Sequence, residues 1–189
     1  DLGCGPGRLA LLLPPETLYV GVDYSSEILD LAREASQSAM ARTRFVQADL
    51  LSDPWTERTS GNFDWVILRA VLHHIPGYEN RLSILQRAAQ MSAPGGHILL
   101  ANWQFLKIER LRKRILPWET IGMEAQDVER GDYLLDWRRQ GHGLRYVHLV
   151  DEEETLKLIA EAGLALDELY YADGHTNDLT LYALLSYAT

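Results

Sequence analysis

A glycine-rich segment, Asp1-Leu-Gly-Cys-Gly-Pro-Gly7, limits the folds open to this sequence more than any other feature. Glycine at every second position lets the backbone turn sharply and approach a ligand closely. Dinucleotide-binding loops use a different spacing, G-x-G-x-x-G, to hold a pyrophosphate at a helix N-terminus. Here an acid precedes the glycines, where it repels a phosphate and attracts a cationic amino group. The segment predicts a strand-to-helix ligand loop and disfavours an NAD-dependent oxidoreductase; an ordinary glycine-rich turn is the alternative.

The rest of the sequence alternates short apolar runs with amphipathic stretches, which is typical of βα units on a parallel sheet. We predict strands over Leu18–Asp23, Thr43–Ala48, Phe63–Leu68 and Gly96–Asn102, and helices over Gly7–Leu13, Ser25–Ser36 and Tyr78–Met91. The same rhythm resumes later with a strand over Leu144–Val150, a helix over Asp151–Ala162, and an antiparallel hairpin of Leu164–Tyr171 and Leu179–Ser186.

Residues 104–143 interrupt this rhythm with a basic amphipathic stretch followed by acidic and Gly-rich turns. We interpret them as an insertion on the substrate side of a single domain, 1–189. Asp1-Leu2 resembles the carboxyl end of a first strand, so we expect an incomplete strand there and further sequence before it. One cysteine, Cys4, cannot form an internal disulfide, which favours a reducing compartment, and we expect the cytoplasm.

The charge is unevenly distributed along the sequence. The net charge is −9, but segment 103–145 holds 9 of the 18 Lys and Arg residues against 7 acids, a balance of +2. The remainder, with 9 basic and 20 acidic residues, has a balance of −11. General attraction to nucleic acid is therefore not expected, whereas a local contact with a polyanion is compatible with the sequence.

Acidic residues end successive predicted strands. Asp23 follows the glycine-rich segment by about 20 residues, where an acid can accept hydrogen bonds from both hydroxyls of a ribose, with Tyr24 beside the base. Asp49 ends the next strand, with Leu50 after it. A helix cap at Asp23 and a turn at Asp49 are the alternatives. Ligands of open α/β sheets bind at the carboxyl ends of strands, so we favour a shared ligand site.

These acids, with Phe63-Asp64 opening the fourth strand and the turn Pro94-Gly95-Gly96, resemble the motifs of class I S-adenosylmethionine (SAM)-dependent methyltransferases. The resemblance implies an α/β fold: a Rossmann-like, seven-stranded, mostly parallel sheet with flanking helices, an antiparallel last strand and the insertion after strand 5. It implies SAM as the cofactor. The cofactor-binding residues that it implies are Asp1, Gly3, Cys4, Gly5, Gly7, Asp23, Tyr24, Asp49, Leu50 and Arg69.

A second set of residues is similar to the tRNA wobble-uridine methyltransferases that esterify 5-carboxymethyluridine. Asp132, Trp137, Arg145, Tyr146 and His148 match that family's pattern. Arg145 can pair bidentately with a carboxylate, and aromatic rings can stack on an unstacked base. His73 and His74, after the fourth strand, are candidates for positioning substrate or taking a proton. The predicted catalytic residues are therefore Arg145, His73, His74, Tyr146 and His148; polar positions of an edge strand and core histidines are the alternatives.

The basic stretch Lys107–Arg114 can contact phosphates, but the sequence favours the alternative, a solvated face of an ordinary amphipathic helix. No Cys/His cluster suggests a metal, so none is expected. We predict O-methylation of a carboxylate on a tRNA uridine, with a small activating partner subunit possible by resemblance. The alternatives are a small-molecule O- or N-methyltransferase and a non-catalytic methyltransferase-like subunit.

Overall fold

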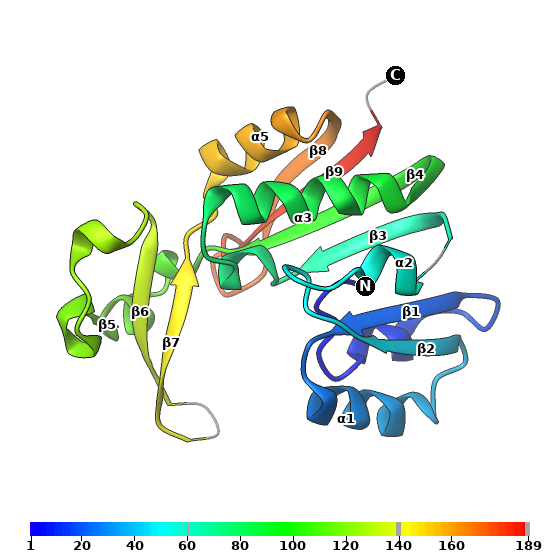
Figure 1. Cartoon of the computed structure of the whole chain (residues 1–189), viewed down its shortest axis with the longest axis horizontal. Helices are drawn as coiled ribbons and strands as arrows, with labels where there is room; N and C mark the ends of the chain where they lie inside the picture. Colours follow the sequence, from blue (N-terminus) through cyan, green and yellow to red (C-terminus); the bar gives the residue numbers. More distant parts are fainter. Residues whose placement is uncertain (60, 139–140, 188–189) are drawn as a thin grey trace.

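A mixed β-sheet forms the centre of the molecule in the computed structural model, which describes residues 1–59, 61–138 and 141–187 (Figure 1). Its strands are β1 (Leu18–Asp23), β2 (Arg42–Gln47), β3 (Phe63–Arg69), β4 (Ser92–Trp103), β8 (Leu164–Ala172) and β9 (Thr180–Tyr187). Strands β1 and β2 pair in parallel, and a second group has the order β3-β4-β9-β8. Leu2 joins the two groups through bridges to Val22 and Leu68. The order across the sheet is therefore β2-β1-Leu2-β3-β4-β9-β8.

The direction of the strands agrees with the Rossmann-like expectation. β3 and β4 are parallel, while β9 runs antiparallel to both β4 and β8. Because β1, β2, β3 and β4 all run the same way, their carboxyl ends lie at one edge of the sheet, on the left in Figure 1. The residues that follow these strands in the sequence therefore meet in space.

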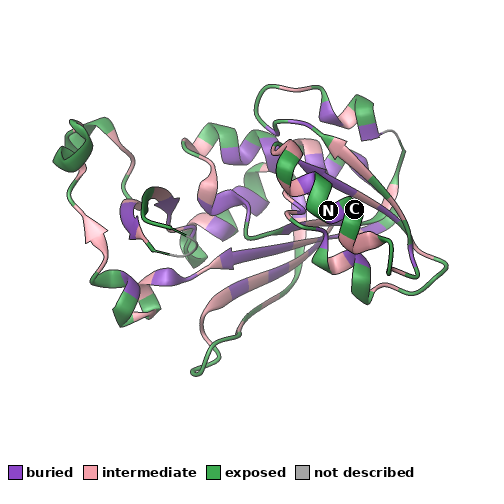
Figure 2. Cartoon of the chain, turned by 90° about the horizontal axis from the view of Figure 1, so that it is seen from below, coloured by how far each residue is buried: buried purple, intermediate pink, exposed green. Residues whose placement is uncertain are grey.

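Helices cover the sheet and close the hydrophobic core. They are α1 (Ser26–Ser36), α2 (Trp55–Thr59), α3 (Tyr78–Met91) and α5 (Glu152–Glu161), with the 3-10 turns η1 (Arg8–Leu12) and η2 (Leu72–His74). The Ser25 hydroxyl caps α1 by accepting from the Ile28 amide, and Asp151 caps α5 in the same way. Buried residues follow the strands and the inner faces of α3 and α5 (Figure 2). Among the described residues, no helix is long and apolar enough to cross a membrane.

The insertion forms a small separate sheet beyond the carboxyl end of β4. Its elements are η3 (Phe105–Lys107), α4 (Glu109–Arg112), β5 (Ile115–Leu116), η4 (Trp118–Ile121), η5 (Ala125–Asp127), β6 (Asp132–Trp137) and β7 (Gly143–His148). The strands pair antiparallel in the order β5-β6-β7. Phe105, Leu111, Leu135 and Val147 form its own core, separate from the main one. This unit stands to one side of the main sheet in Figure 1.

The structure corrects three expectations. The predicted strand Leu144–Val150 does not continue the main sheet, because β7 pairs with β6 inside the insertion. β7 is exposed at Gly143 and Leu144 and buried at Val147 and His148, so it is not a strand buried on both faces along its whole length, as a central parallel strand would be. The basic amphipathic stretch is also not one helix: it is divided among η3, the four-residue α4 and β5. The predicted turn Pro94-Gly95-Gly96 lies within β4, at a register shift against β3.

Candidate functional site

The glycine-rich segment folds into a loop with left-handed backbone at alternate residues. Gly3, Gly5 and Gly7 have φ angles of 66°, 54° and 68°. A Cβ on Gly3 would lie 2.6 Å from a Val71 methyl group, so packing alone requires glycine there. A Cβ on Gly5 would meet no atom within 4 Å. The loop therefore leaves open space above Gly5, and a side chain there would fill it.

Asp23 connects this loop to the start of α1. The residue is 8% exposed, and its carboxylate accepts hydrogen bonds from the Gly5 amide (2.9 Å) and the Ser25 amide (3.1 Å). Asp23 can therefore both order the start of α1 and bind a ribose, because its carboxylate also lies beside the open glycine-rich loop. A carboxylate has about four acceptor positions, so two amides do not saturate it. Hydroxyl groups of a ligand can use the others.

The remaining residues predicted to bind cofactor differ in exposure. Asp1 accepts from the Tyr19 hydroxyl at 2.7 Å, and Tyr24 is 74% exposed next to Asp23. Cys4 packs beneath the loop in a small apolar cluster, and burial, with the nearby charge of Asp23, raises the pKa of its thiol to about 11. Its thiol is therefore a packing group, and its amide, which donates to the Val22 carbonyl, holds the loop to β1.

In the loop after β2, the side chain of Asp49 is used in a turn of the protein itself. Asp49 accepts from the Leu51 amide at 2.9 Å and from the Ser52 hydroxyl at 3.0 Å, the arrangement of an Asx turn. Leu50 is 8% exposed and packs in the main core. Its carbonyl oxygen accepts from the Trp55 indole at 3.1 Å. The turn interpretation of Asp49 is therefore satisfied within the protein, and the Leu50 side chain faces inward.

The loop after β3 is strained and carries the two histidines. Ala70 has a φ of 61°. This left-handed conformation costs free energy in a residue with a Cβ, and such strained residues occur mostly at functional sites. Burial lowers the pKa of His73 well below its usual value, so this 2%-exposed imidazole is neutral. Burial and the neighbouring Arg145 lower the pKa of His74 to about 4. Neither histidine is therefore a cation at neutral pH.

His74 and Arg145 meet although 71 residues separate them in the sequence. Arg145 Nη2 lies 3.2 Å from His74 Nε2. Because a guanidinium only donates, His74 Nε2 must be the acceptor, and the ring proton is on Nδ1. The Arg145 guanidinium also lies over the Trp137 ring, with its Cζ 4.3 Å from the ring centroid. The structure thus brings together three residues predicted to contact substrate and fixes the guanidinium from two sides.

His148 and Tyr146, by contrast, belong to a buried junction. His148 is 1% exposed, and its two ring nitrogens lie 2.6 Å from Asp132 Oδ1 and 2.6 Å from Glu154 Oε2. The Tyr146 hydroxyl also donates to Asp132, at 2.6 Å. Burial by itself disfavours the imidazolium, but the hydrogen bonds to Glu154 and Asp132 outweigh it and raise the pKa of His148. These side chains fix the insertion to α5, in place of the substrate contacts predicted for them.

Arg81 is the centre of this junction, and the sequence analysis missed it. Its guanidinium is 1% exposed and pairs with Glu154 at 2.7 Å and Glu129 at 2.9 Å. It also donates to the Ile75 carbonyl at 2.9 Å. A signal was available, since Arg81 shares the buried face of α3 with Ile84, Leu85 and Ala88 at helical spacing, and an arginine there requires partners.

Glu129, Asp132 and His148 also have the composition of a metal site, with ligand atoms within 4.8 Å of one another. The hydrogen bonds and ion pairs of these three residues explain why they lie together without a metal ion. Glu129 pairs with Arg81, and Asp132 accepts from Tyr146 and His148. Cationic and hydroxyl partners already surround these carboxylates, so the cluster is an ion-pair network of the protein itself.

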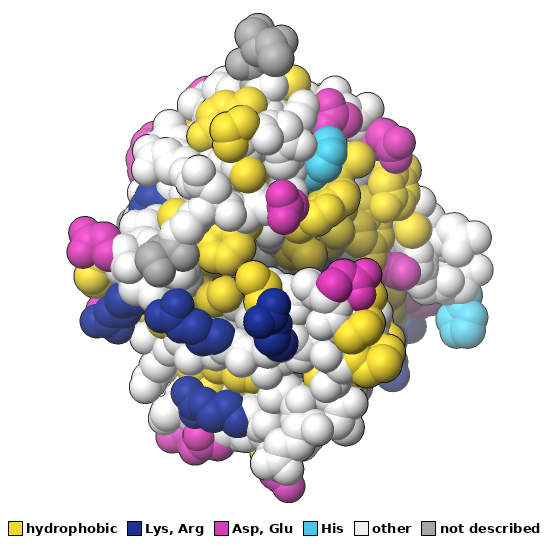
Figure 3. Space-filling view, turned by 90° about the vertical axis from the view of Figure 1, so that its right-hand side faces the viewer, with side chains coloured by type: hydrophobic (Ala, Val, Ile, Leu, Met, Phe, Trp, Pro, Cys, Tyr) yellow, Lys and Arg dark blue, Asp and Glu magenta, His cyan; other side chains and the backbone are white. Residues whose placement is uncertain are grey.

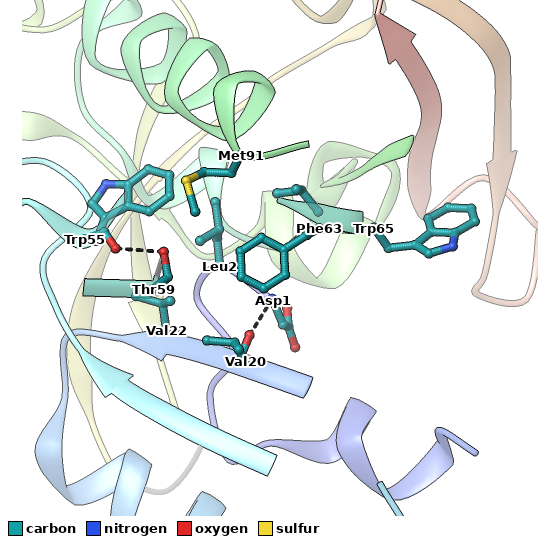
Figure 4. A pocket seen from close by; sticks show the side chains of 10 residues that line it. Asp1, Leu2, Val20, Val22, Trp55, Thr59, Phe63, Trp65 and Met91 are labelled. Atoms are coloured by element: carbon teal, nitrogen blue, oxygen red, sulfur yellow. Dashed lines mark hydrogen bonds between the residues drawn. The ribbon is translucent and has the colours of Figure 1, made fainter. Parts of the chain in front are cut away.

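Two hollows lie at opposite ends of the molecule. The edge at the amino ends of β1 and β3 shows exposed hydrophobic side chains around a depression (Figure 3). A gap of about 20 Å³ between Leu2, Val22, Trp55 and Met91 has space for about one water molecule, and Trp65 points away from it (Figure 4). A cleft of about 450 Å³ lies instead between the carboxyl end of β4 and the insertion. Only the second is large enough for a small organic ligand.

Proteins with similar sequences are methyltransferases, which agrees with a ligand site at the carboxyl ends of the strands. Residues 1–96 match the protein family described as methyltransferase domain. A protein of Encephalitozoon cuniculi named as a methyltransferase is 29% identical over 185 residues, covering 98% of this chain and 76% of that protein. Mouse tRNA (carboxymethyluridine(34)-5-O)-methyltransferase is 33% identical over 103 residues, which is 54% of this chain. The match spans only 14% of the length of that mouse protein.

Solved structures share the fold. A SAM-dependent methyltransferase from Methanosarcina mazei superposes with a TM-score of 0.73 at 22% identity, covering 99% of this chain and 90% of the other. The N-methyltransferase NodS from Bradyrhizobium japonicum, solved with S-adenosylhomocysteine, has a TM-score of 0.66 at 17% identity. That match covers 100% of this chain and 76% of the other. The Rossmann-like architecture is therefore that of class I methyltransferases.

The open space above Gly5 leads to a prediction. We expect Gly5→Ala to weaken binding of S-adenosylhomocysteine at least about 10-fold, a loss of roughly 1.4 kcal/mol, because the added methyl group enters the cradle. Gly163→Ala is the matched control, since Gly163 also has a positive φ (71°) and no neighbour within 4 Å of its Cβ position. Both variants carry a backbone cost of roughly 1–2 kcal/mol. Equal affinities of the two variants by calorimetry would contradict a cradle at Gly5.

The junction predicts a pH dependence of folding stability. The pKa of His148 is raised in the folded protein. The stabilisation that its protonated ring gives to the fold is therefore complete below the unfolded-state pKa of about 6.5 and is lost as pH rises through the folded-state pKa. His148→Gln leaves buried carboxylates uncompensated and is expected to lower the free energy of unfolding by about 3–5 kcal/mol near pH 6. In the wild type the free energy of unfolding should fall as pH rises through the folded-state pKa of His148. In the variant this fall should be absent, as measured by urea denaturation at several pH values. The exposed His175→Gln is the control, and an equal effect there would refute the assignment.

Proposed function

This chain belongs to the methyltransferase-domain family of SAM-dependent enzymes, and from that premise we propose that it methylates a carboxylate oxygen of 5-carboxymethyluridine at the tRNA wobble position. The observation that carries the proposal is the guanidinium of Arg145, held between Trp137 and His74 beside the loop that follows β3. An arginine fixed in orientation is suited to binding a planar carboxylate by two parallel hydrogen bonds. The named activity of the mouse relative supports the same acceptor.

The residues at the strand ends fit a ligand with a cationic amino group and ribose hydroxyls. In our proposal Asp1 receives the amino group, Asp23 the hydroxyls and Tyr24 the base, with Gly3, Gly5 and Gly7 allowing the close approach. When bound, SAM supplies a methyl group on a sulfonium, open to in-line attack by the acceptor oxygen. The 8% exposure of Asp23 keeps its charge largely out of water, which strengthens its hydrogen bonds.

The acceptor oxygen needs alignment more than a base. A carboxylate is already ionised at neutral pH, so no proton has to be removed from it before attack. The low pKa of His74, about 4, agrees with this, since a neutral imidazole accepts from Arg145 and thereby orients it. We assign His74 as a positioning residue and Arg145 as the group that contacts the acceptor. His73, neutral and buried behind it, supports the loop.

Two further parts of the proposal concern the assembly. We propose that Leu2 belongs to a central strand of a seven-stranded sheet, because it bridges β1 and β3 at that position. We also propose that a small activating partner subunit assists tRNA binding, since the residues outside segment 103–145 carry 20 acids against 9 basic residues, and this excess of negative charge repels RNA.

Arg145→Lys tests the proposed carboxylate contact. Charge is kept, but lysine cannot reproduce the planar pair of donors, so kcat/KM on tRNA containing 5-carboxymethyluridine should fall by roughly 10–100-fold. Affinity for S-adenosylhomocysteine should stay near the wild-type value. Methylated nucleosides are quantified by mass spectrometry of digested tRNA. An unchanged kcat/KM would remove Arg145 from the acceptor site, and absence of tRNA methylation by the wild type would favour a small-molecule acceptor.

A further inference from the structure

The cleft between β4 and the insertion has the composition of a nucleotide site. Its lining residues are Trp103, Ile108, Arg110, Leu111, Arg114, Trp137, Arg138 and Leu179. Its volume of about 450 Å³ is within the range of small-ligand sites, roughly 300–1,000 Å³. Arg138 is paired with Asp136, so Arg110 and Arg114 provide the positive charge of the cleft and the two tryptophans its planar apolar surface.

The structure divides the basic stretch Lys107–Arg114 into two groups. Arg110 and Arg114 line the cleft, and within the described part of the chain no carboxylate forms an ion pair with either. Lys107 instead pairs with Asp178 at 3.5 Å, and Lys113 with Glu109 at 2.7 Å. The charge of Arg114 acts on the nearby Asp136, which forms its ion pair with Arg138, but no described carboxylate lies within ion-pair distance of Arg110 or Arg114. An anionic ligand can therefore pair with both arginines.

The tryptophans form two walls of the cleft. The rings of Trp103 and Trp137 are nearly perpendicular, at 89°, with centroids 6.4 Å apart. Such a corner presents ring faces and edges to a flat group, which is how proteins hold unstacked bases of RNA. Trp103 also lies 5.8 Å from His73, and Trp137 carries Arg145 over its ring. The two tryptophans of the cleft therefore also contact residues of the proposed acceptor site.

We propose that this cleft binds one unstacked nucleotide of the RNA acceptor, with its base against the tryptophan rings and its phosphate on Arg110 and Arg114. The inference rests on the proposed function and deepens it, because it names the residues that select RNA over a small carboxylate. Phosphate contacts position the RNA, and the aromatic corner requires a base that has left its stack.

Two double variants with the same charge change test the proposal. Arg110→Ala/Arg114→Ala removes the cations of the cleft, while Arg112→Ala/Lys113→Ala removes two neighbouring cations that are not among its lining residues. The probe is a fluorescent anticodon stem-loop RNA containing 5-carboxymethyluridine, with binding followed by anisotropy at several salt concentrations. The first variant should bind at least 10-fold more weakly and lower the log–log salt slope by roughly 0.7–0.9, the change expected for one lost phosphate contact. The second should change the slope little.

A comparison of two ligands, one with a base and one without, tests the proposed stacking on the tryptophan rings separately. Uridine 5′-monophosphate should quench tryptophan fluorescence of the wild type at lower concentration than ribose 5-phosphate, which has the phosphate without the base. Trp137→Phe should reduce this quenching. Equal behaviour of the two ligands would overturn base stacking in the cleft.

Calorimetry with S-adenosylhomocysteine separates this inference from the proposed function. Equal loss of RNA binding in the two double variants, with cofactor binding intact, would show general electrostatics and overturn the cleft alone. Failure of the wild type to bind S-adenosylhomocysteine would overturn the proposed function, whatever the RNA result. Selective loss in Arg110→Ala/Arg114→Ala with unchanged cofactor affinity is the outcome that supports the cleft.

Discussion

The buried guanidinium of Arg81 holds together the two parts of the molecule on which the site depends. It joins α3 to Glu154 of α5 and to Glu129 of the insertion, and Glu154 continues through His148 to Asp132. A charge this deeply buried is costly unless its partners are in place, so Glu129 of the insertion and Glu154 of α5 have to lie beside it. That placement brings β7, with Arg145, against the loop after β3. The geometry at His74 and Trp137 is thus a consequence of an ion network that has no contact with substrate in our proposal.

The chemistry at the two ends of this arrangement is different. The glycine-rich loop and Asp23 offer negative charge and backbone groups, which suits a cationic ligand with hydroxyls. The insertion offers arginines and tryptophans, which suits an anionic aromatic ligand. The neutral histidines lie between them, at the strained turn around Ala70. A reaction in which an anionic oxygen meets a cationic methyl donor requires such a separation of charge.

Local sequence patterns predicted most of the main sheet. β1 and α3 have the predicted boundaries, and α1, β3, β8 and β9 differ by one residue at one or both ends. Their periodicity is strong because each buries a continuous face. β7 was assigned to the wrong sheet, since its own residues do not reveal which strand it pairs with. The basic stretch is amphipathic but is not one helix, because the 3-10 turn, α4 and β5 divide it where Phe105, Leu111 and Ile115 reach the insertion's core.

The sequence by itself determined the class of fold, the loop that faces a SAM-like ligand, and the acid at the end of β1. These features are local: glycine spacing, strand length and the position of an acid after a strand follow from backbone stereochemistry. Only the tertiary structure decided which of the matched residues share a site. Arg145 and His74, 71 residues apart, meet, whereas His148, three residues from Arg145, turns into a buried junction. Neighbouring residues of a strand point to opposite faces, and what each face meets depends on packing between distant segments, which no local pattern records.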